Sequence, residues 1–359
     1  MDSLTDISQG AQCRSGLPDV QGPEAEACRH GSGACLADEI CGFLDAADIA
    51  YDKATVSGLT LIDTGYGIGI LPLEITAKSP EEASAYRIRA GQVLSGQDCS
   101  QGICSGRRII AVAEDRWRSE GECIRRRLLA HLGRFVHVFA RNCEVRRIRN
   151  DEAKAFMDAW HSYGSTVCRY RYGLFLKKAA GNGIAPVTAD PAGESTGCMH
   201  TGYLPAGTMV AAATFSNGRL MERGGRMYRS YQWIRYASLP DVRVAGGMGK
   251  IMAYFLADAG IRQDDGDLDI MSYADLEWSD GGVYRELGFR AEDRKSPVMY
   301  AIDPADWKRC PVSRLAGAAD GRIAAPESRN SLLYFENFGS IRYRYVPHKN
   351  DCHEETLLH

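Results

Sequence analysis

Residues 242–257 read V-R-V-A-G-G-M-G-K-I-M-A-Y-F-L-A, and residues 268–289 read L-D-I-M-S-Y-A-D-L-E-W-S-D-G-G-V-Y-R-E-L-G-F. The first segment contains three closely spaced glycines, Gly246, Gly247 and Gly249. Glycine allows positive φ angles and lets a ligand come close to the backbone. The free N–H groups and the positive dipole end of a following helix then favour an anion. The stretch therefore predicts a turn that binds an anionic ligand.

The same stretch predicts a helix, a strand and a second helix. Apolar residues at helical spacing follow the glycines, and Gly260 is a suitable stop. These residues are Met248, Ile251, Met252, Phe255 and Ala259. Residues 268–272 form a short apolar run that is typical of a buried strand. We expect Asp280 to cap a helix over residues 281–287 and Gly288 to end it.

This order of elements resembles the second half of the GNAT acyltransferase fold. The GNAT loop usually reads Q/R-x-x-G-x-G/A, and Arg243 and Gly246 fit it, while Met248 replaces the last small residue and Gly249 follows one position later. The S-Y-A-D…G-x-x-Y-x-x-L-G-F block is similar to a phage-associated GNAT branch that includes Mom-type DNA-modification proteins. It is also similar to phage proteins that fuse such a domain to an endonuclease-like one. The resemblance covers about residues 140–303.

The resemblance implies an α+β fold with a GNAT-like mixed, mostly antiparallel sheet flanked by helices. A smaller α/β domain resembling a degenerate endonuclease-like fold is expected before it. The expected divisions are a disordered lead-in over 1–41, the small domain over 42–140, the acyltransferase domain over 141–305, and an extension with a mobile tail over 306–359. Within the extension, residues 340–346 alternate and predict an edge strand, packed half-buried or serving as a nucleic-acid stacking surface.

Further elements are expected along the chain, with Asp151 capping a helix that follows the first strand of the GNAT-like order. Helices are expected over residues 81–93 and 114–132, strands over 108–113, 143–148, 172–176, 209–215, 231–237 and 299–302, the last closing the sheet, and a long loop over 179–205.

The predicted function is transfer of an acyl group from acetyl-CoA, or another acyl-CoA, to an amine, such as a nucleobase or a protein amine. This chemistry must hold a pyrophosphate, deprotonate an amine and stabilise a thiolate. The expected cofactor-binding residues are Val244, Gly246, Gly247, Gly249 and the backbone of Lys250. A simple glycine-rich turn is the alternative for this loop.

Two side chains are candidates for the chemistry itself. Tyr284 is a phenol at the position of the GNAT helix tyrosine, and a phenol of reference pKa ≈ 10 is a sensible proton source for a thiolate. Asp275 follows the predicted strand and is a candidate base or amine ligand. The alternatives are a core aromatic for Tyr284 and a turn cap for Asp275.

Substrate contacts are assigned to His161, Arg235 and Ser272, and Arg219 is a further candidate for an anion. His161 and Gly164 match a His-x-x-Gly feature of the phage branch. The alternatives are structural: a packed histidine for His161 and surface ion pairs for Arg235 and Arg219.

The resemblance to a nuclease implies a carboxylate pair for Mg²⁺ and a nearby lysine. Asp63 and Glu74 are the candidate pair, but Thr76 stands where the lysine belongs, and Lys78 comes two residues later. We therefore expect a domain that does not cut DNA rather than an active nuclease.

Twelve arginines face five acidic residues within 107–149. This region binds a polyanion such as a nucleic acid, or it is a solvated face paired with local carboxylates. A nucleic-acid-binding or nucleic-acid-modifying protein of mobile-element origin is thus the alternative function. A dinucleotide enzyme fits poorly, because no acid closes a strand about 20 residues after the glycines.

Composition sets the remaining limits. The formal net charge of −3 favours no partner class, and the 359 residues suffice for two domains. The 12 cysteines show no C-x-x-C, so we expect no metal site and reduced thiols. No apolar run reaches the length of a membrane span, and the start lacks the features of a signal peptide, so no membrane and a cytoplasmic location are expected.

Overall fold

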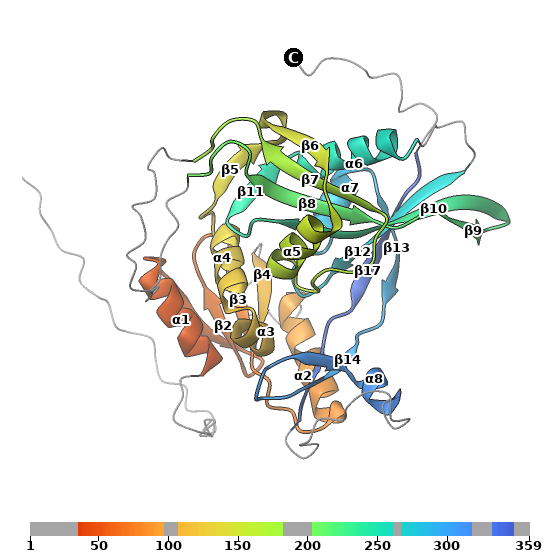
Figure 1. Cartoon of the computed structure of the whole chain (residues 1–359). Helices are drawn as coiled ribbons and strands as arrows, with labels where there is room; N and C mark the ends of the chain where they lie inside the picture. The colour runs from red at the N-terminus through yellow and green to blue at the C-terminus, as the bar shows by residue number, and fades with distance from the viewer. Residues whose placement is uncertain (1–34, 97–106, 182–202, 261–266, 318–331, 348–359) are drawn as a thin grey trace, which may run out of the picture. The chain divides into compact units, whose positions relative to one another are not determined.

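A computed structural model of the chain describes residues 35–96, 107–181, 203–260, 267–317 and 332–347 (Figure 1). The protein is a mixed α+β structure with mostly antiparallel sheets and several helices. The expectations for the lead-in before residue 35, for most of the loop over 179–205 and for the tail after residue 347 lie outside the described residues.

The first sheet has the strand order β1-β2-β3-β4, with β3 and β4 parallel and the other pairs antiparallel. The side chains of its strands contribute alternately to two hydrophobic cores, one on each face of the sheet, because successive side chains of a strand point to opposite faces. In β4, Ile110 and Val112 belong to the core on one face of the sheet, whereas Ala111 and Ala113 belong to the core on the other face. The strands are Asp52–Val56 (β1), Leu59–Asp63 (β2), Ile68–Leu73 (β3) and Arg108–Ala113 (β4).

Helices cover both faces of this sheet. One core combines α1 (Leu36–Ala46) and α4 (Gly121–His131) with the sheet, and it includes Trp117 of α3 (Glu114–Ser119). The other core combines α2 (Pro80–Leu94) with a three-stranded sheet, β15-β14-β16. That small sheet consists of Arg309–Pro311 (β15), Met299–Ile302 (β14) and Leu333–Glu336 (β16), with α8 (Val312–Gly317) beside it.

The second large sheet has the order β13-β17-β12-β10-β8-β7-β6, with β9 paired to β10. Its described ladders are antiparallel except for that between β10 and β12, which is parallel. Its strands are Cys143–Arg147 (β6), Tyr170–Leu176 (β7), Met209–Phe215 (β8), Arg219–Arg223 (β9), Arg226–Ser238 (β10), Leu268–Asp275 (β12), Arg290–Lys295 (β13) and Ser340–Tyr345 (β17).

Two helices pack on opposite faces of this sheet. Phe255 of α6 (Gly247–Asp258) stacks on Phe215 with ring centroids 4.1 Å apart. Phe156 and Met157 of α5 (Asn150–Trp160) pack against Ala212 and other residues on the opposite face. A separate parallel pair joins β5 (Val136–Phe139) to β11 (Val242–Ala245), and β11 leads directly into α6.

Several expected boundaries are wrong. The expected helix over 114–132 is broken at Glu120 because the hydroxyl of Ser119 donates to the Asp115 carbonyl and Gly121 weakens the helix. The α5 helix begins at Asn150, so Asp151 lies in its first turn, and the Glu152 carboxylate accepts the N–H of Arg149 instead.

The expected cap of the second helix is also wrong. The cap of α7 (Gly282–Glu286) is Gly281 in the left-handed conformation, and Asp280 only accepts the N–H of Gly282. A Cβ at Gly281 would come within 2.3 Å of the Tyr343 ring, which explains why glycine stands there. Gly288 does end the helix at φ 82°, as expected.

The position of β17 differs most from the expectation. It lies between β12 and β13 rather than at an edge, and Tyr343 is fully buried. Residues 299–302 therefore do not close the large sheet. Instead, β14 belongs to the small sheet, and the chain returns to the large sheet through β17.

Candidate functional site

A cavity of about 310 Å³ lies at the N-terminus of α6. It is bounded by the glycine turn, by the end of β10, by α7 and by α4. Its volume is within the range of small-molecule sites. The residues that line it are Arg127, Ala130, His131, Tyr236, Ser238, Pro240, Val242, Arg243, Val244, Gly246, Gly247, Met248, Gly249, Val283, Glu286 and Leu287.

The glycines keep this cavity open. Gly246 is the N-cap of α6 at φ 74°, a conformation that L side chains rarely adopt. A Cβ at Gly247 would come within 3.0 Å of Val244 and 3.2 Å of the Tyr236 hydroxyl. A Cβ at Gly249 would come within 3.3 Å of Leu287. The helix end thus presents bare backbone to the cavity, where an anion can meet its first N–H groups.

Four of the five expected cofactor-binding residues line the cavity, and Lys250 does not. The N–H of Lys250 donates to the Gly246 carbonyl as part of the helix. Its Nζ donates to the carbonyls of Ala140, at 2.9 Å, and Cys143, at 2.7 Å. Lys250 therefore ties α6 to the turn Ala140–Asn142 instead of facing the cavity.

Two arginines outside the expected set of cofactor-binding residues also line the cavity. Arg127 of α4 donates to the Ser162 hydroxyl at 3.3 Å and lies 4.2 Å over the Trp278 ring. It forms no ion pair with any described carboxylate, and burial together with the neighbouring Arg116 lowers its pKa. Arg243 is exposed and lies over the Phe135 ring. A guanidinium without a carboxylate partner suits an anionic ligand.

The strands β10 and β12 separate before β10 reaches the cavity at Tyr236 and Ser238. Their parallel ladder ends at the pair Gln232–Met271. From Trp233 onward β10 pairs with β8, whereas β12 stays paired with β17 in a ladder that already begins at Ile270. The first residues beyond the ladder are Trp233 and Ser272. The Ser272 hydroxyl bridges the opening strands because it lies 3.1 Å from the Trp233 carbonyl oxygen.

The Tyr284 hydroxyl lies at the same opening, 2.8 Å from Oγ of Ser272. Because a carbonyl only accepts, Ser272 donates to Trp233 and Tyr284 can donate to Ser272. The Tyr284 ring also stacks on Tyr343, with centroids 5.3 Å apart. Burial raises the pKa of Tyr284. It is both a packed aromatic and a protonated hydroxyl at the strand opening.

Asp275 is not beside Tyr284. It is the last residue of β12, three positions after Ser272, and its side chain therefore points to the opposite face of the strand. Its carboxylate accepts the Tyr163 hydroxyl at 2.7 Å and the N–H of Glu277 at 3.0 Å. Burial and the nearby Glu277 carboxylate raise its pKa.

Asp275 borders a buried ion network that joins the two large sheets. Arg309 of β15 pairs with Asp115 of α3 and, at 2.6 Å, with Glu277 after β12. Arg116 lies 3.2 Å from Glu277 and 3.9 Å from Asp275. Burial acts against the charge of Glu277, but Arg309 and Arg116 lower its pKa. The network holds the end of β12 in place.

His161 and Gly164 form a turn rather than an open site. The N–H of Gly164 donates to the His161 carbonyl at 2.7 Å, and Nδ1 of His161 accepts the N–H of Tyr163. Burial, with Arg235 and Arg127, lowers the pKa of His161 to about 3. Arg235 donates to the carbonyls of Gly164 and Ile234. These contacts show a structural use of the His-x-x-Gly spacing.

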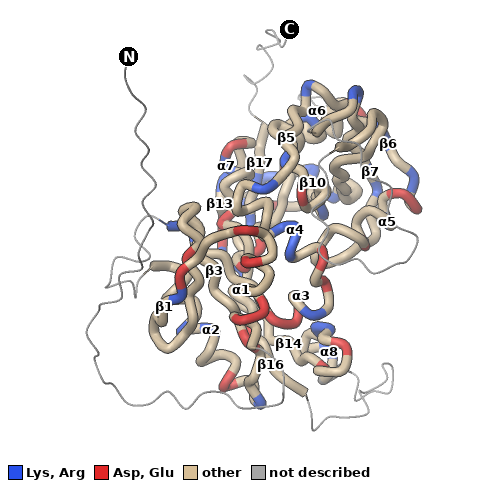
Figure 2. The backbone as a smooth tube through the Cα atoms, turned by 90° about the vertical axis from the view of Figure 1, so that its left-hand side faces the viewer, with Lys and Arg blue, Asp and Glu red and all other residues tan. Residues whose placement is uncertain are grey.

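The arginine-rich region 107–149 is largely satisfied within the protein. Figure 2 shows basic and acidic positions interspersed around α3 and α4. Arg118 bonds Glu39 and Glu114, and Arg126 bonds Asp241 at 2.6 Å. Further pairs are Arg107 with Asp63, Arg116 with Glu277, Arg146 with Glu144, Arg147 with Asp258, and Arg149 with Asp151.

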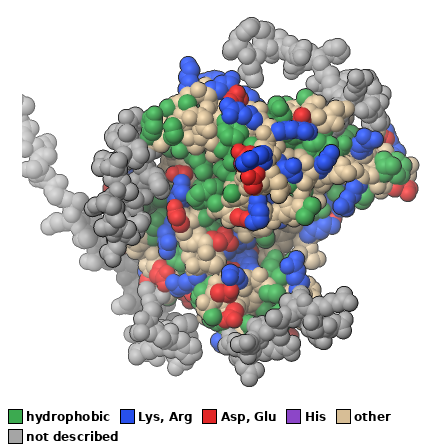
Figure 3. Space-filling view, in the orientation of Figure 1, with side chains coloured by type: hydrophobic (Ala, Val, Ile, Leu, Met, Phe, Trp, Pro, Cys, Tyr) green, Lys and Arg blue, Asp and Glu red, His purple; other side chains and the backbone are tan. Residues whose placement is uncertain are grey.

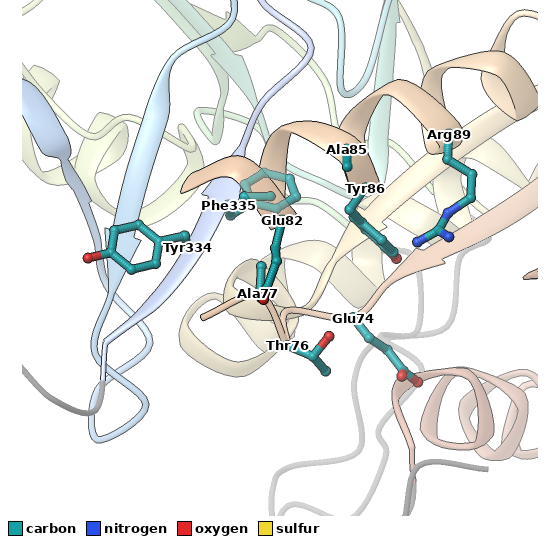
Figure 4. Close-up of a pocket in the computed structure, with 10 residues that line it drawn as sticks. Glu74, Thr76, Ala77, Glu82, Ala85, Tyr86, Arg89, Tyr334 and Phe335 are labelled. Carbon is teal, nitrogen blue, oxygen red and sulfur yellow. The ribbon is translucent and has the colours of Figure 1, made fainter. Parts of the chain in front are cut away.

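The candidate nuclease pair is not assembled. Asp63 pairs across the sheet with Gly69 near the start of β3, whereas Glu74 follows the end of that strand. Gly69, the partner of Asp63, and Glu74 are five residues apart, which places Asp63 and Glu74 about 16 Å apart along the strand direction. Glu74 and Thr76 instead line a second cavity of about 280 Å³ with Tyr86 and Arg89 of α2 (Figure 4). Burial raises the pKa of Glu74.

No protein-family model matches the chain, and no curated protein matches it. Among the described residues, no helix is both long and apolar enough to cross a membrane. The described cysteines are free thiols at Cys35, Cys41, Cys123, Cys143, Cys168 and Cys310.

Proposed function

We propose that the protein is an acyl-CoA-dependent N-acyltransferase with a GNAT-like fold and acetyl-CoA as its donor. The observation that carries the proposal is the cavity at the bare N-terminus of α6, which Tyr236 and Ser238 line from the part of β10 that follows the end of its ladder with β12. A donor of this class is a long molecule with an anionic pyrophosphate, an amide-containing arm and a thioester.

The chain offers a matching group for each part of such a donor. The α6 N-terminus, Arg127 and Arg243 suit the phosphates. The strand edges beyond Gln232 and Met271 suit an extended amide chain, because neither strand pairs with the other there. The expected order of strand, glycine turn, helix, strand, tyrosine-bearing helix and Gly-Phe is present.

When bound, the donor supplies an activated carbonyl and a thiolate leaving group. The contribution of Tyr284 is a proton held at the strand opening, since a phenol of raised pKa stays protonated at neutral pH. Ser272 orients that hydroxyl and is itself fixed by the Trp233 carbonyl. Asp275 lies on the other face of β12, where it suits the acceptor side better than a direct partnership with Tyr284.

Calorimetric titration with coenzyme A, NAD and ATP tests the proposal on the full chain. We expect coenzyme A to bind with one-to-one stoichiometry and to raise the melting temperature, and NAD to do neither. A screen for thiol release from acetyl-CoA across amines, peptides and DNA then identifies the acceptor. Binding of NAD without binding of coenzyme A would support a dinucleotide enzyme instead.

A further inference from the structure

A further cavity, of about 650 Å³, is lined by α2 and by Arg294 of β13, and we call it the α2–β13 cavity. The start of β4, residues 276–280 and Phe338 form its other walls. Its volume suits a small molecule. No residue lines both this cavity and the cavity at the N-terminus of α6, so the two are separate sites.

The two carboxylates in the walls of the α2–β13 cavity are neutralised by arginines outside it. Glu277 bonds Arg309 at 2.6 Å, and its side chain is almost fully buried. Asp280 bonds Arg285 at 2.6 Å, and this hydrogen bond is the main cause of the lowered pKa of Asp280. Neither carboxylate therefore leaves an uncompensated negative charge at the cavity.

Four arginines line the cavity, and two of them have no carboxylate partner among the described residues. Arg108 donates to the Trp278 carbonyl at 2.8 Å. Arg294 is exposed, and its neighbour in the β13–β17 ladder is the apolar Ile341. The other two arginines are neutralised by carboxylates outside the cavity, in the pairs Arg87–Glu336 and Arg107–Asp63.

With each ion pair counted as neutral, the walls keep the two positive charges of Arg108 and Arg294. This excess is local. Figure 3 shows basic and acidic side chains interspersed over the face that it displays, rather than gathered in one broad basic patch. Two charges within a cavity suit a small dianion better than a long polyanion.

The α2–β13 cavity also has an apolar wall. Ile88 of α2 lines it and is 52% exposed. Leu94 and Phe338 line it too, and both are only partly buried against the core beneath α2. An apolar side chain that faces a cavity is stabilised when a ligand removes it from water. The walls thus match a ligand with an anionic group and an apolar body.

We propose that the α2–β13 cavity binds a phosphate monoester with an apolar body. A phosphate monoester carries about −1.5 to −2 charges near pH 7, which matches two guanidiniums, whereas a carboxylate carries one charge. Arg108 and Arg294 donate charge-assisted hydrogen bonds to the phosphate oxygens. The organic body of the ligand covers Ile88 and Phe338. This site is independent of the proposed acyl transfer.

Titrations of the full chain with phenyl phosphate and with benzoate, followed by ligand-observed ¹H NMR, test the proposal. Phenyl phosphate should bind more tightly than benzoate, which has the same ring but a single charge. Arg108→Gln/Arg294→Gln should weaken binding of phenyl phosphate by about tenfold or more, since a hydrogen bond to a charged group is typically worth that factor. Coenzyme A binding should not change, because neither residue lines the cavity at α6.

The matched control is Arg219→Gln/Arg290→Gln. It removes two exposed arginines, one in β9 and one in β13, that do not line the cavity, and it should bind phenyl phosphate as wild type does. Ile88→Ser should weaken binding of phenyl phosphate but not of inorganic phosphate, which has no body to cover the side chain. Equal binding of phenyl phosphate by Ile88→Ser and wild type would contradict the apolar part of the assignment.

Arg108→Gln also loses the hydrogen bond to the Trp278 carbonyl, so Arg294→Gln alone provides a variant without that loss. Its melting temperature without ligand should equal that of wild type, because Arg294 is exposed. An unchanged affinity of Arg294→Gln for phenyl phosphate would overturn the proposal. Equal affinities of wild type for phenyl phosphate and benzoate would also overturn it, as would displacement of phenyl phosphate by coenzyme A.

Discussion

Tyr284 and Asp275 lie on opposite faces of β12. The Tyr284 hydroxyl is 2.8 Å from Oγ of Ser272, whereas the Asp275 carboxylate accepts the Tyr163 hydroxyl beyond α5. The two groups therefore cannot act on one atom as a directly bonded pair. In the proposed reaction, we therefore place Tyr284 on the donor side and Asp275 on the acceptor side.

Gly247→Asp should abolish binding of coenzyme A. A side chain at this position would meet Val244 and Tyr236, and its carboxylate would repel the pyrophosphate at the helix N-terminus. Isothermal titration calorimetry measures the effect. Gly42→Asp is the matched control, since Gly42 is exposed and a Cβ there meets nothing within 4 Å. Equal affinity in wild type and Gly247→Asp would place the donor site elsewhere.

Tyr284→Phe should slow turnover by about 10²–10⁴-fold, the usual cost of losing a general acid. The ring would keep its stacking on Tyr343, so the loss of stability should not exceed that of one hydrogen bond, about 0.5–1.5 kcal/mol. Affinity for coenzyme A should not change. Tyr66→Phe, at an exposed tyrosine, is the control. Unchanged activity per folded molecule would reduce Tyr284 to a packing role.

Asp275→Asn should raise the KM for the acceptor and leave coenzyme A binding intact, because Asp275 does not line the donor cavity. Stability provides a second readout. The folded pKa of Asp275 is raised, so wild type loses stability as pH rises from the unfolded value towards the folded one. The variant should not show this loss. Melting temperatures across the acidic range measure it, and parallel profiles would contradict the raised pKa.

His131→Phe should make the protein less sensitive to acid. Burial, with Arg127 and Arg108, lowers the pKa of His131 to about 3, and the ring stacks on Trp278. The unfolded chain takes up a proton near pH 6.5, so wild type loses stability as pH falls from there towards 3. The variant keeps an aromatic ring but has no imidazole at this position to take up a proton on unfolding. Thermal unfolding at pH 7.5 and 4.5 checks the difference, with exposed His137→Phe as control.

Arg309→Met should destabilise the protein strongly. It leaves Asp115 and Glu277 buried without their main cationic partner, and breaking a buried pair typically costs about 3–5 kcal/mol. Urea unfolding measures the change. Arg314→Met removes an exposed arginine five residues away and should have little effect. A loss below about 1 kcal/mol in Arg309→Met would show that water replaces the guanidinium.

Local signals along the chain predicted many elements well. The strands over 108–113 and 209–215 and the helix after Gly246 occupy their expected positions, because apolar periodicity and glycine stops act over a few residues. The strand β9 was missed because its side chains are mostly exposed and show no apolar alternation. The internal position of β17 depends on pairing with strands far away in sequence, and alternation alone does not specify a partner.

The candidate site was predictable to the same extent. Residues of the glycine turn line the cavity because they are contiguous in sequence. Arg127 and Tyr236 come from other elements, and only the folded arrangement brings them there. Asp275 and Tyr284 are close in sequence, which led us to expect them side by side. However, Asp275 lies three residues after Ser272 in β12, so its side chain points to the face opposite to Ser272 and Tyr284.

The insertion of β17 between β12 and β13 has a consequence for synthesis of the chain. Tyr343 packs against Tyr284 and donates to the Asp280 carbonyl, so the helix that bears Tyr284 lacks its support until residue 345 has left the ribosome. The eight-stranded sheet must then wait for a strand that is translated more than 60 residues after β12 ends. Nascent chains truncated at residue 330 should accordingly be held by chaperones and cleaved by proteases, while full-length chains resist both.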